Sequence, residues 1–184
     1  MKGLIKKLNQ IGVLERQKVI LKSKKTSHFY IDIKKAYGFS EILNEITDRL
    51  YVLIPKEANC IAASDYGGLP IATSISSKYG LNLTLIRNKK KNHGLNKLID
   101  GYIPNPKDKV IIVDDVMTTG SSLKKIIRVI KPTKAKILGC YVVVNRGKAN
   151  LKYPLHWLFE AKDFLKNEQK RESKDNLQVS QKEV

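Results

Sequence analysis

The chain has 184 residues, of which 42% are hydrophobic and 7% aromatic, a composition that suits one soluble domain with a sizeable core. Lys and Arg number 35 against 17 Asp and Glu, and the net charge of +18 could attract a nucleic acid, an anionic surface or a polyanionic small substrate. The lysines are scattered, however, which favours a lysine-rich surface over a binding patch. No apolar run reaches the roughly 18 residues of a membrane span, and the N-terminus does not resemble a signal peptide, so we expect a cytoplasmic protein without a membrane partner.

The N-terminal third predicts a helix, a hairpin and a second helix. Residues 2–11 carry an apolar stripe at helical spacing, with lysines opposite. Residues 19–35 predict two strands joined by a basic, hydroxyl-rich turn at residues 23–27, which on its own indicates a surface hairpin as readily as a ligand-binding one. Residues 39–50 again show helical periodicity, with Ile42, Leu43, Ile46 and Leu50 inward.

A short strand at residues 59–63 is followed by a turn that contains Gly67 and Gly68. Glycines allow backbone conformations that other residues rarely adopt, and we expect a helix from about Leu69, whose first N–H groups would face an anion. A plain strand-to-helix loop is the other interpretation of this turn.

Residues 82–86 predict another strand, after which a basic stretch runs from Arg87 to Gly101 and includes Lys91 and His93. Runs of like charge are usually solvated loops. This one follows a strand end, however, which is where α/β folds bind ligands, so it is also a candidate ligand loop.

The segment Val110–Ser122 carries the strongest signal for a binding site. Residues 110–113 predict a strand buried on both faces, which is followed by Asp114 and Asp115 and then by small hydroxyl-bearing residues and a glycine. A helix N-terminus of this kind suits a phosphate, whereas two carboxylates suit neighbouring hydroxyl groups, so the segment predicts a site for a phosphorylated sugar. The phosphate contacts are expected from Thr118, Thr119, Gly120, Ser121 and Ser122.

The rest of the chain predicts a helix at residues 123–131 and a strand at residues 135–144 that leads to Arg146, whose guanidinium would suit a planar carboxylate. Cys60 and Cys140 lie in apolar strands, and we expect buried free thiols rather than a disulfide or a metal site. Residues 166–184 are polar and nearly balanced in charge, which predicts a disordered tail after a single domain at residues 1–165.

Five segments, in this order, resemble the orotate phosphoribosyltransferases, which are type I phosphoribosyltransferases. They are LKSKKTSHFYID (residues 21–32), GLPIA (68–72), RNKKKNHG with IDG (87–94 and 99–101), VIIVDDVMTTGSS (110–122) and the arginine after the strand at 135–144. The chain departs from the family pattern at Lys24, at His28 and at Asn88, where the family usually carries glycine, proline and lysine respectively.

The resemblance implies roles for these residues. Asp114 and Asp115 would meet the ribose hydroxyls of phosphoribosyl diphosphate (PRPP), and residues 118–122 would hold its 5-phosphate. The pyrophosphate contacts would come from Lys22, Tyr66, Gly67, Gly68, Arg87, Lys91 and His93. Orotate would be bound by Lys22, Tyr30, Ile31, Thr118 and Arg146.

The resemblance also implies a central, mostly parallel sheet flanked by helices, with a core at residues 36–147 and a hood built from residues 1–35 and C-terminal residues. It implies transfer of the phosphoribosyl group from PRPP to orotate in UMP biosynthesis, with Mg²⁺ carried by PRPP rather than by protein ligands. It further implies a homodimer in which the loop at residues 87–101 is shared between subunits. A PRPP-binding regulator that acts on nucleic acid, or a transferase for another base, are the alternatives, but the chain carries no recognisable nucleic-acid-binding module.

Overall fold

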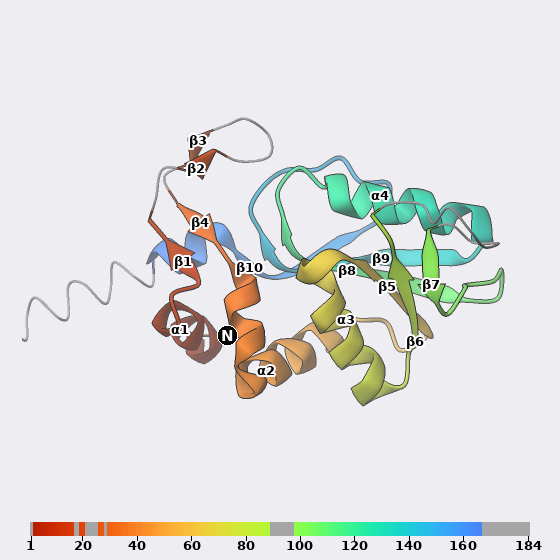
Figure 1. Ribbon diagram of the computed structural model, residues 1–184, viewed down its shortest axis with the longest axis horizontal. Coiled ribbons are helices and arrows are strands. Elements are labelled where there is room, and N and C mark those ends of the chain that lie inside the picture. The colour runs from red at the N-terminus through yellow and green to blue at the C-terminus, as the bar shows by residue number, and fades with distance from the viewer. Residues whose placement is uncertain (1, 17–18, 21–25, 28, 89–97, 167–184) are drawn as a thin grey trace, which may run out of the picture.

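The central sheet of the protein has the strand order β10-β9-β8-β5-β6-β7 in a computed structural model that describes residues 2–16, 19–20, 26–27, 29–88 and 98–166 (Figure 1). Its strands pair in parallel except for β7, which pairs antiparallel with β6. The strands are β5 (Cys60–Ser64), β6 (Asn82–Ile86), β7 (Ile99–Gly101), β8 (Lys109–Met117), β9 (Lys136–Asn145) and β10 (Leu155–Glu160). The predicted α/β class with a mostly parallel sheet is therefore confirmed.

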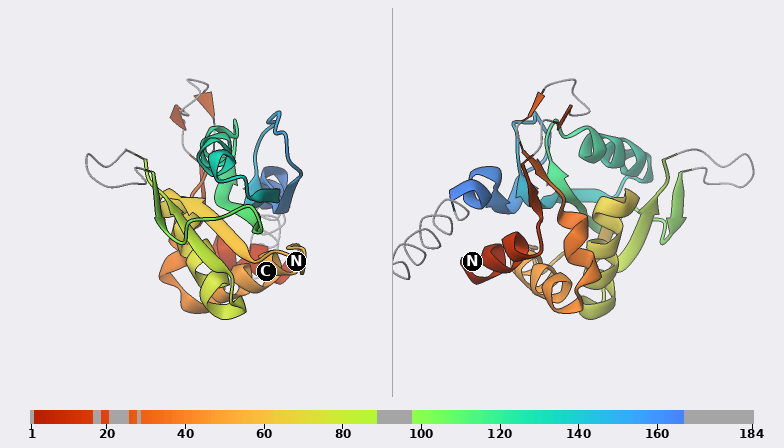
Figure 2. Two further views of the ribbon diagram at one scale, coloured as in Figure 1. Left: turned by 90° about the vertical axis from the view of Figure 1, so that its right-hand side faces the viewer. Right: turned by 60° about the vertical axis from the view of Figure 1, so that its left-hand side comes forward.

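Helices cover both faces of this sheet (Figures 1 and 2). The helices α1 (Lys2–Gln10), α2 (Ser40–Tyr51) and α3 (Asp65–Tyr79) lie on one face, and α4 (Ser121–Ile130) lies on the other. Alternate residues of β8 enter the two cores: Ile111 and Val113 pack with α1 to α3, whereas Val110 and Ile112 pack with α4. This double burial explains why the strand reads as an unbroken apolar run.

The N-terminal segment adds two small strand pairs outside the sheet. The strands β2 (Val19–Ile20) and β3 (Thr26–Ser27) pair antiparallel, which confirms the hairpin, although its second strand lies inside the predicted turn. In addition, β1 (Leu14–Glu15) pairs with β4 (Tyr30–Ile31), a pairing that the sequence analysis missed. A 3-10 helix, η1 (Ile33–Gly38), then leads into α2.

The two ends of the described chain meet beside α1. The Asn9 side-chain amide donates a hydrogen bond to the Phe164 carbonyl at 3.3 Å, which links α1 to the helical residues 161–166. Residue 166 thus belongs to a helix, and the rest of the predicted tail lies outside the described residues. A hood shared between the N-terminal segment and C-terminal residues stays a prediction.

Two predicted boundaries were wrong. The helix expected from Leu69 begins at Asp65, so Gly67 and Gly68 lie in the first turn of α3 rather than in a loop before it. The strand expected to end at Val113 continues to Met117, so Asp114 and Asp115 lie inside β8. In both places, backbone pairing continues through residues whose types favour turns.

Cys60 and Cys140 are buried free thiols, as predicted. None of the helices in the described ranges is long and apolar enough to cross a membrane. The basic segment predicted at residues 87–101 ends in β7, which the sequence analysis did not foresee.

Candidate active site

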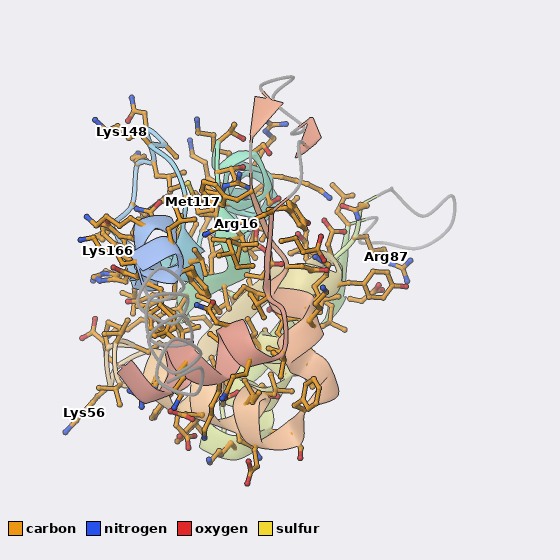
Figure 3. All side chains as sticks on the ribbon, turned by 90° about the vertical axis from the view of Figure 1, so that its left-hand side faces the viewer. Arg16, Lys56, Arg87, Met117, Lys148 and Lys166 are labelled. Atoms are coloured by element: carbon orange, nitrogen blue, oxygen red, sulfur yellow. The ribbon has the colours of Figure 1, made fainter. Side chains whose placement is uncertain are left out.

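The sheet has a topological switch point, the crevice of open parallel sheets, where the strand order reverses at the carboxyl ends of β5 and β8. From β5 the chain moves outward to β6, and it then returns to the other side of β5 to add β8, β9 and β10. Ligands of open parallel sheets bind at such a switch point, outside the carboxyl ends of the strands. Figure 3 shows Lys148, which follows β9, and Lys56, which precedes β5, on opposite sides of the molecule, as the parallel strands require.

Two adjacent carboxylates stand at the end of β8. Asp114 is 7% exposed, and its Oδ1 accepts a hydrogen bond from the Asp115 amide at 3.0 Å. Burial and, after it, the charge of Asp115 raise the pKa of Asp114 well above its ordinary value. Asp115 is half-buried, and its Oδ1 accepts a hydrogen bond from the Val116 amide at 2.7 Å.

The glycine turn at the start of α3 lies directly against these carboxylates. A Cβ added to Gly67 would lie 2.5 Å from Oδ1 of Asp115, and one added to Gly68 would lie 2.6 Å from the carbonyl oxygen of Val113. A side chain at Gly68 would push the turn away from the backbone of β8, whereas one at Gly67 would displace the Asp115 carboxylate from its present position. Asp65, the first residue of α3, has φ +60°, a conformation that is strained for a residue with a side chain.

The hydroxyl-rich segment after β8 forms the N-terminus of α4. Thr118, Thr119 and Ser121 are exposed, and Gly120 is the N-cap with φ +73°. The segment packs against the chain that follows β9: a Cβ added to Gly147 would clash with the Thr118 carbonyl oxygen. Exposed hydroxyls beside free helix N–H groups form a fitting cradle for a phosphate.

Arg146 connects the end of β9 to the N-terminal segment. Its backbone amide donates to the Met117 carbonyl at 2.8 Å, and its Nη2 donates to the Phe29 carbonyl at 2.6 Å. The guanidinium also lies 4.6 Å from the centroid of the Phe29 ring. Partial burial lowers the pKa of Arg146, but an arginine stays charged at any working pH.

Together these features form a phosphate cradle, a carboxylate pair and a glycine turn around one crevice, and the same combination occurs in a known family. The phosphoribosyl transferase domain model matches residues 33–179 of the chain. The chain belongs to the phosphoribosyltransferase family.

Its curated relatives within the phosphoribosyltransferases include two archaeal enzymes. The orotate phosphoribosyltransferase of Pyrococcus abyssi is 37% identical over 146 residues, which cover 78% of this chain and 80% of the relative. That of Methanothermobacter thermautotrophicus is 38% identical over 143 residues, 78% of each chain. Among solved structures, orotate phosphoribosyltransferase from Aeropyrum pernix matches with a TM-score of 0.78 at 26% identity, over 89% of this chain and 96% of that one.

The structure brings many of the predicted site residues together at this crevice. Residues 66–68, 114–115, 118–122, Tyr30 and Arg146 follow or flank the strand ends, although Tyr66 is fully open to solvent at 86% exposure. The Ile31 side chain is buried in the core with α1 and α2, which leaves its backbone for the expected contact with the base, and that contact stays a prediction. Lys22, Lys91 and His93 lie outside the described residues.

The start of the basic segment is tied to the crevice by polar contacts. Arg87, which follows β6, forms an ion pair with Asp100 of β7. The Asn88 amide group donates to Asp65 and accepts from Lys125 of α4. Position 88 lacks the lysine of the family pattern, but Lys125 of α4 brings a positive charge to the same place.

Sequence reasoning missed three polar side chains at this site. Lys125 reaches Asn88 from α4, as described above. Lys34 and Tyr37, both on η1, approach Asp115 and Gly67: the Lys34 Nζ lies 4.0 Å from Oδ2 of Asp115, and the Tyr37 hydroxyl donates to the Gly67 carbonyl at 2.6 Å. None of the three belongs to a recognised motif, because each is distant in sequence from the site residue that it contacts.

Within the described ranges, no group of three or more His, Cys, Asp or Glu residues could enclose a metal ion. Asp114 and Asp115 offer two carboxylates at the end of β8. A pair of this kind suits a hydrated Mg²⁺ that arrives bound to a phosphate ligand better than a resident ion with a full protein coordination shell.

The burial of Asp114 leads to a prediction about stability. Because its pKa is raised in the folded state, the folded protein binds this proton more tightly than the unfolded chain. Stability contributed by Asp114 is thus lost as the pH rises from its ordinary pKa to the raised one. Asp114→Asn should raise the thermal midpoint by a few degrees at pH 8, and the gain should shrink as the pH falls.

The matched control is Asp48→Asn. Hydrogen bonds from Lys78 and Tyr79 lower the pKa of Asp48, so this substitution should have the opposite sign, lowering the midpoint at pH 8. Calorimetric scans from pH 5 to pH 8 measure both variants. A lower midpoint for Asp114→Asn across this range would contradict the prediction.

Proposed function

We propose that this protein is an orotate phosphoribosyltransferase, which converts orotate and PRPP into orotidine 5-monophosphate and pyrophosphate in cytoplasmic UMP biosynthesis. The observation that carries the proposal is the contact between the Asp115 carboxylate and the backbone of Gly67, flanked by the phosphate cradle and by Arg146. Its relatives with the highest identities reported above carry the same activity in their names.

The geometry suits a reaction whose charge separates in the transition state. As the bond from ribose C1 to the diphosphate breaks, positive charge grows on the ribose and negative charge on the leaving group. Asp114 and Asp115 accept hydrogen bonds from the ribose hydroxyls and lie near the growing positive charge. The free N–H groups at the start of α3 face the leaving pyrophosphate, and those at the start of α4 hold the 5-phosphate.

When both phosphate groups are held in fixed positions, the reacting carbon has little freedom to move. Positioning of this kind contributes the larger part of the catalysis in such a reaction. In this proposal, Mg²⁺ enters with PRPP and offsets the charge of the diphosphate. Arg87, Lys91 and His93 approach the same diphosphate from the basic segment, and Lys22 from the hairpin.

Arg146 accounts for the choice of base. A carboxylate on the base can accept two parallel hydrogen bonds from a guanidinium, whereas purines and uracil carry no such group. The Phe29 ring under the guanidinium fixes its plane, and Tyr30 lies on the adjoining strand β4. Orotate thus fits between this strand and the end of β8, near Thr118.

The decisive experiment measures the loss of orotate absorbance when Mg²⁺ and PRPP are added to the purified protein. Adenine, hypoxanthine and uracil serve as parallel substrates. Turnover with orotate alone is the expected result. No turnover with any base, in a protein that still binds PRPP, would contradict the proposed reaction and favour a PRPP-binding regulator.

The carboxylate contact of Arg146 predicts a selective defect. Arg146→Gln should raise the KM for orotate by about 100-fold, because a charge-assisted hydrogen bond to a buried partner contributes about 1.5–3 kcal/mol. Affinity for PRPP should change little. Arg146→Lys should recover only part of the loss, since an ammonium cannot form the fork.

Arg128→Gln is the control for this variant, because Arg128 is an exposed arginine on the outer surface of α4. Steady-state kinetics with each substrate varied in turn separate the two KM values. Equal increases in KM for orotate and for PRPP would contradict the assignment of Arg146.

The segment at residues 87–101 is proposed to complete the site of a second subunit in a homodimer. Lys91→Ala and Asp115→Asn should each inactivate the protein, Lys91→Ala by about 3 kcal/mol of transition-state stabilisation. After random exchange of the two variants, half of the dimers are mixed and one of their two sites is intact, so activity should return to about a quarter of the wild-type value. Mixed dimers without activity would show instead that each site is self-contained.

A further inference from the structure

The 3-10 helix η1 sends two polar side chains to the crevice, and the proposed mechanism uses neither of them. It spans Ile33–Gly38 and joins β4, beside the proposed base site, to α2. Residues three apart eclipse one another in a 3-10 helix, so Lys34 and Tyr37 share one face of η1. That face meets β8 and the first turn of α3.

Tyr37 makes the closer of the two contacts. Its hydroxyl donates a 2.6 Å hydrogen bond to the carbonyl of Gly67. Burial first, and then the charges of Asp115, Asp114 and Asp32, raise the pKa of Tyr37 far above its ordinary value. The phenol therefore stays protonated, and stays a hydrogen-bond donor, at every pH at which the protein is folded.

Gly67, which receives this hydrogen bond, is one of two adjacent glycines in the turn. Gly67 and Gly68 have no side chains with which to anchor themselves, and glycine loses more conformational entropy on ordering than any other residue. The turn nevertheless packs closely on β8, since a Cβ on Gly68 would lie 2.6 Å from the Val113 carbonyl oxygen. A tie from outside the turn therefore stabilises its catalytic position.

Lys34 supports the carboxylate on the opposite side of this contact. Its Nζ lies 2.5 Å from Oδ1 of Asp32 and 4.0 Å from Oδ2 of Asp115. A cation at this distance attracts the Asp115 carboxylate and offsets part of its repulsion with the neighbouring Asp114. One short helix thus reaches both partners of the Asp115–Gly67 contact.

We propose that Tyr37 is a positioning residue for diphosphate binding: its hydroxyl fixes the Gly67 carbonyl, so that the first N–H groups of α3 are already aimed at the ligand before it binds. The inference rests on the proposed function, because that function assigns the turn to pyrophosphate. Preorganisation of this kind lowers the entropy lost on binding, and its removal appears as weaker affinity.

The variant that tests this is Tyr37→Phe, which removes one oxygen and keeps the ring in its packing. Loss of the hydrogen bond to this part-buried carbonyl should weaken binding of magnesium pyrophosphate by about tenfold, measured by titration calorimetry. The KM for PRPP should rise by a similar factor, while the KM for orotate should change less than about twofold, because the bond acts on the diphosphate side only.

Tyr79→Phe provides a matched control. It removes a hydrogen bond of the same length, 2.6 Å from the Tyr79 hydroxyl to Asp48, at the surface formed by α2 and α3. It should leave pyrophosphate binding unchanged. Amide hydrogen exchange at residues 66–69 of the unliganded protein should accelerate in Tyr37→Phe and not in Tyr79→Phe, because only the former releases the turn.

The outcomes separate this inference from the proposed function. If Tyr37→Phe binds pyrophosphate as tightly as the wild type, or merely melts at a lower temperature with unchanged affinity, Tyr37 is structural and the inference is wrong. If the wild type binds no pyrophosphate, the assignment of the turn fails and the inference fails with it. If pyrophosphate binds with the expected tenfold difference but orotate is not converted, the inference stands and only the base has been assigned wrongly.

Discussion

The contact between the Asp115 carboxylate and the backbone of Gly67 is the constraint on which the site depends. It joins β8 to the first turn of α3 across the point where the strand order reverses. Because a Cβ on Gly68 would lie 2.6 Å from the Val113 carbonyl oxygen, the first turn of α3 and the carboxylates of β8 lie side by side. In the proposed function they hold the pyrophosphate and the ribose. The distance between the two binding functions is thereby set by the sheet and not by flexible loops.

This arrangement carries a cost that the rest of the fold offsets. Asp114 is buried beside a like charge, and Asp65 holds a strained backbone conformation at the start of α3. Both features are unfavourable for folding and persist only where surrounding packing determines them. The two apolar cores on either face of the sheet supply that packing, since β5 and β8 contribute fully buried residues to both of them. The free energy gained from burial in the two cores thus offsets the unfavourable features at the crevice.

The sequence predicted the elements that are set by local pattern. The strand at residues 82–86 and the helices at residues 2–11 and 39–50 appear within a residue or two of their expected bounds, because hydrophobic periodicity is a local property. The errors occur where tertiary pairing overrides it. β8 continues through two carboxylates because β9 pairs with it as far as Met117, and α3 begins four residues early because its first turn packs on β8. Asp and Gly at these positions indicate turns only when no neighbouring strand is present.

Side chains that act on the site from a distance in sequence were beyond prediction for the same reason. Tyr37 and Gly67 are 30 residues apart, and Lys125 and Asn88 are 37 apart, so no spacing rule connects them. Asn88 is an example. In the motif comparison it is a missing lysine in the basic segment, whereas in the structure its neutral amide forms hydrogen bonds with Asp65 of α3 and with Lys125 of α4. A motif comparison shows which positions of the sequence carry a charge. The fold decides where the charged group of a long side chain, such as that of Lys125, lies in space.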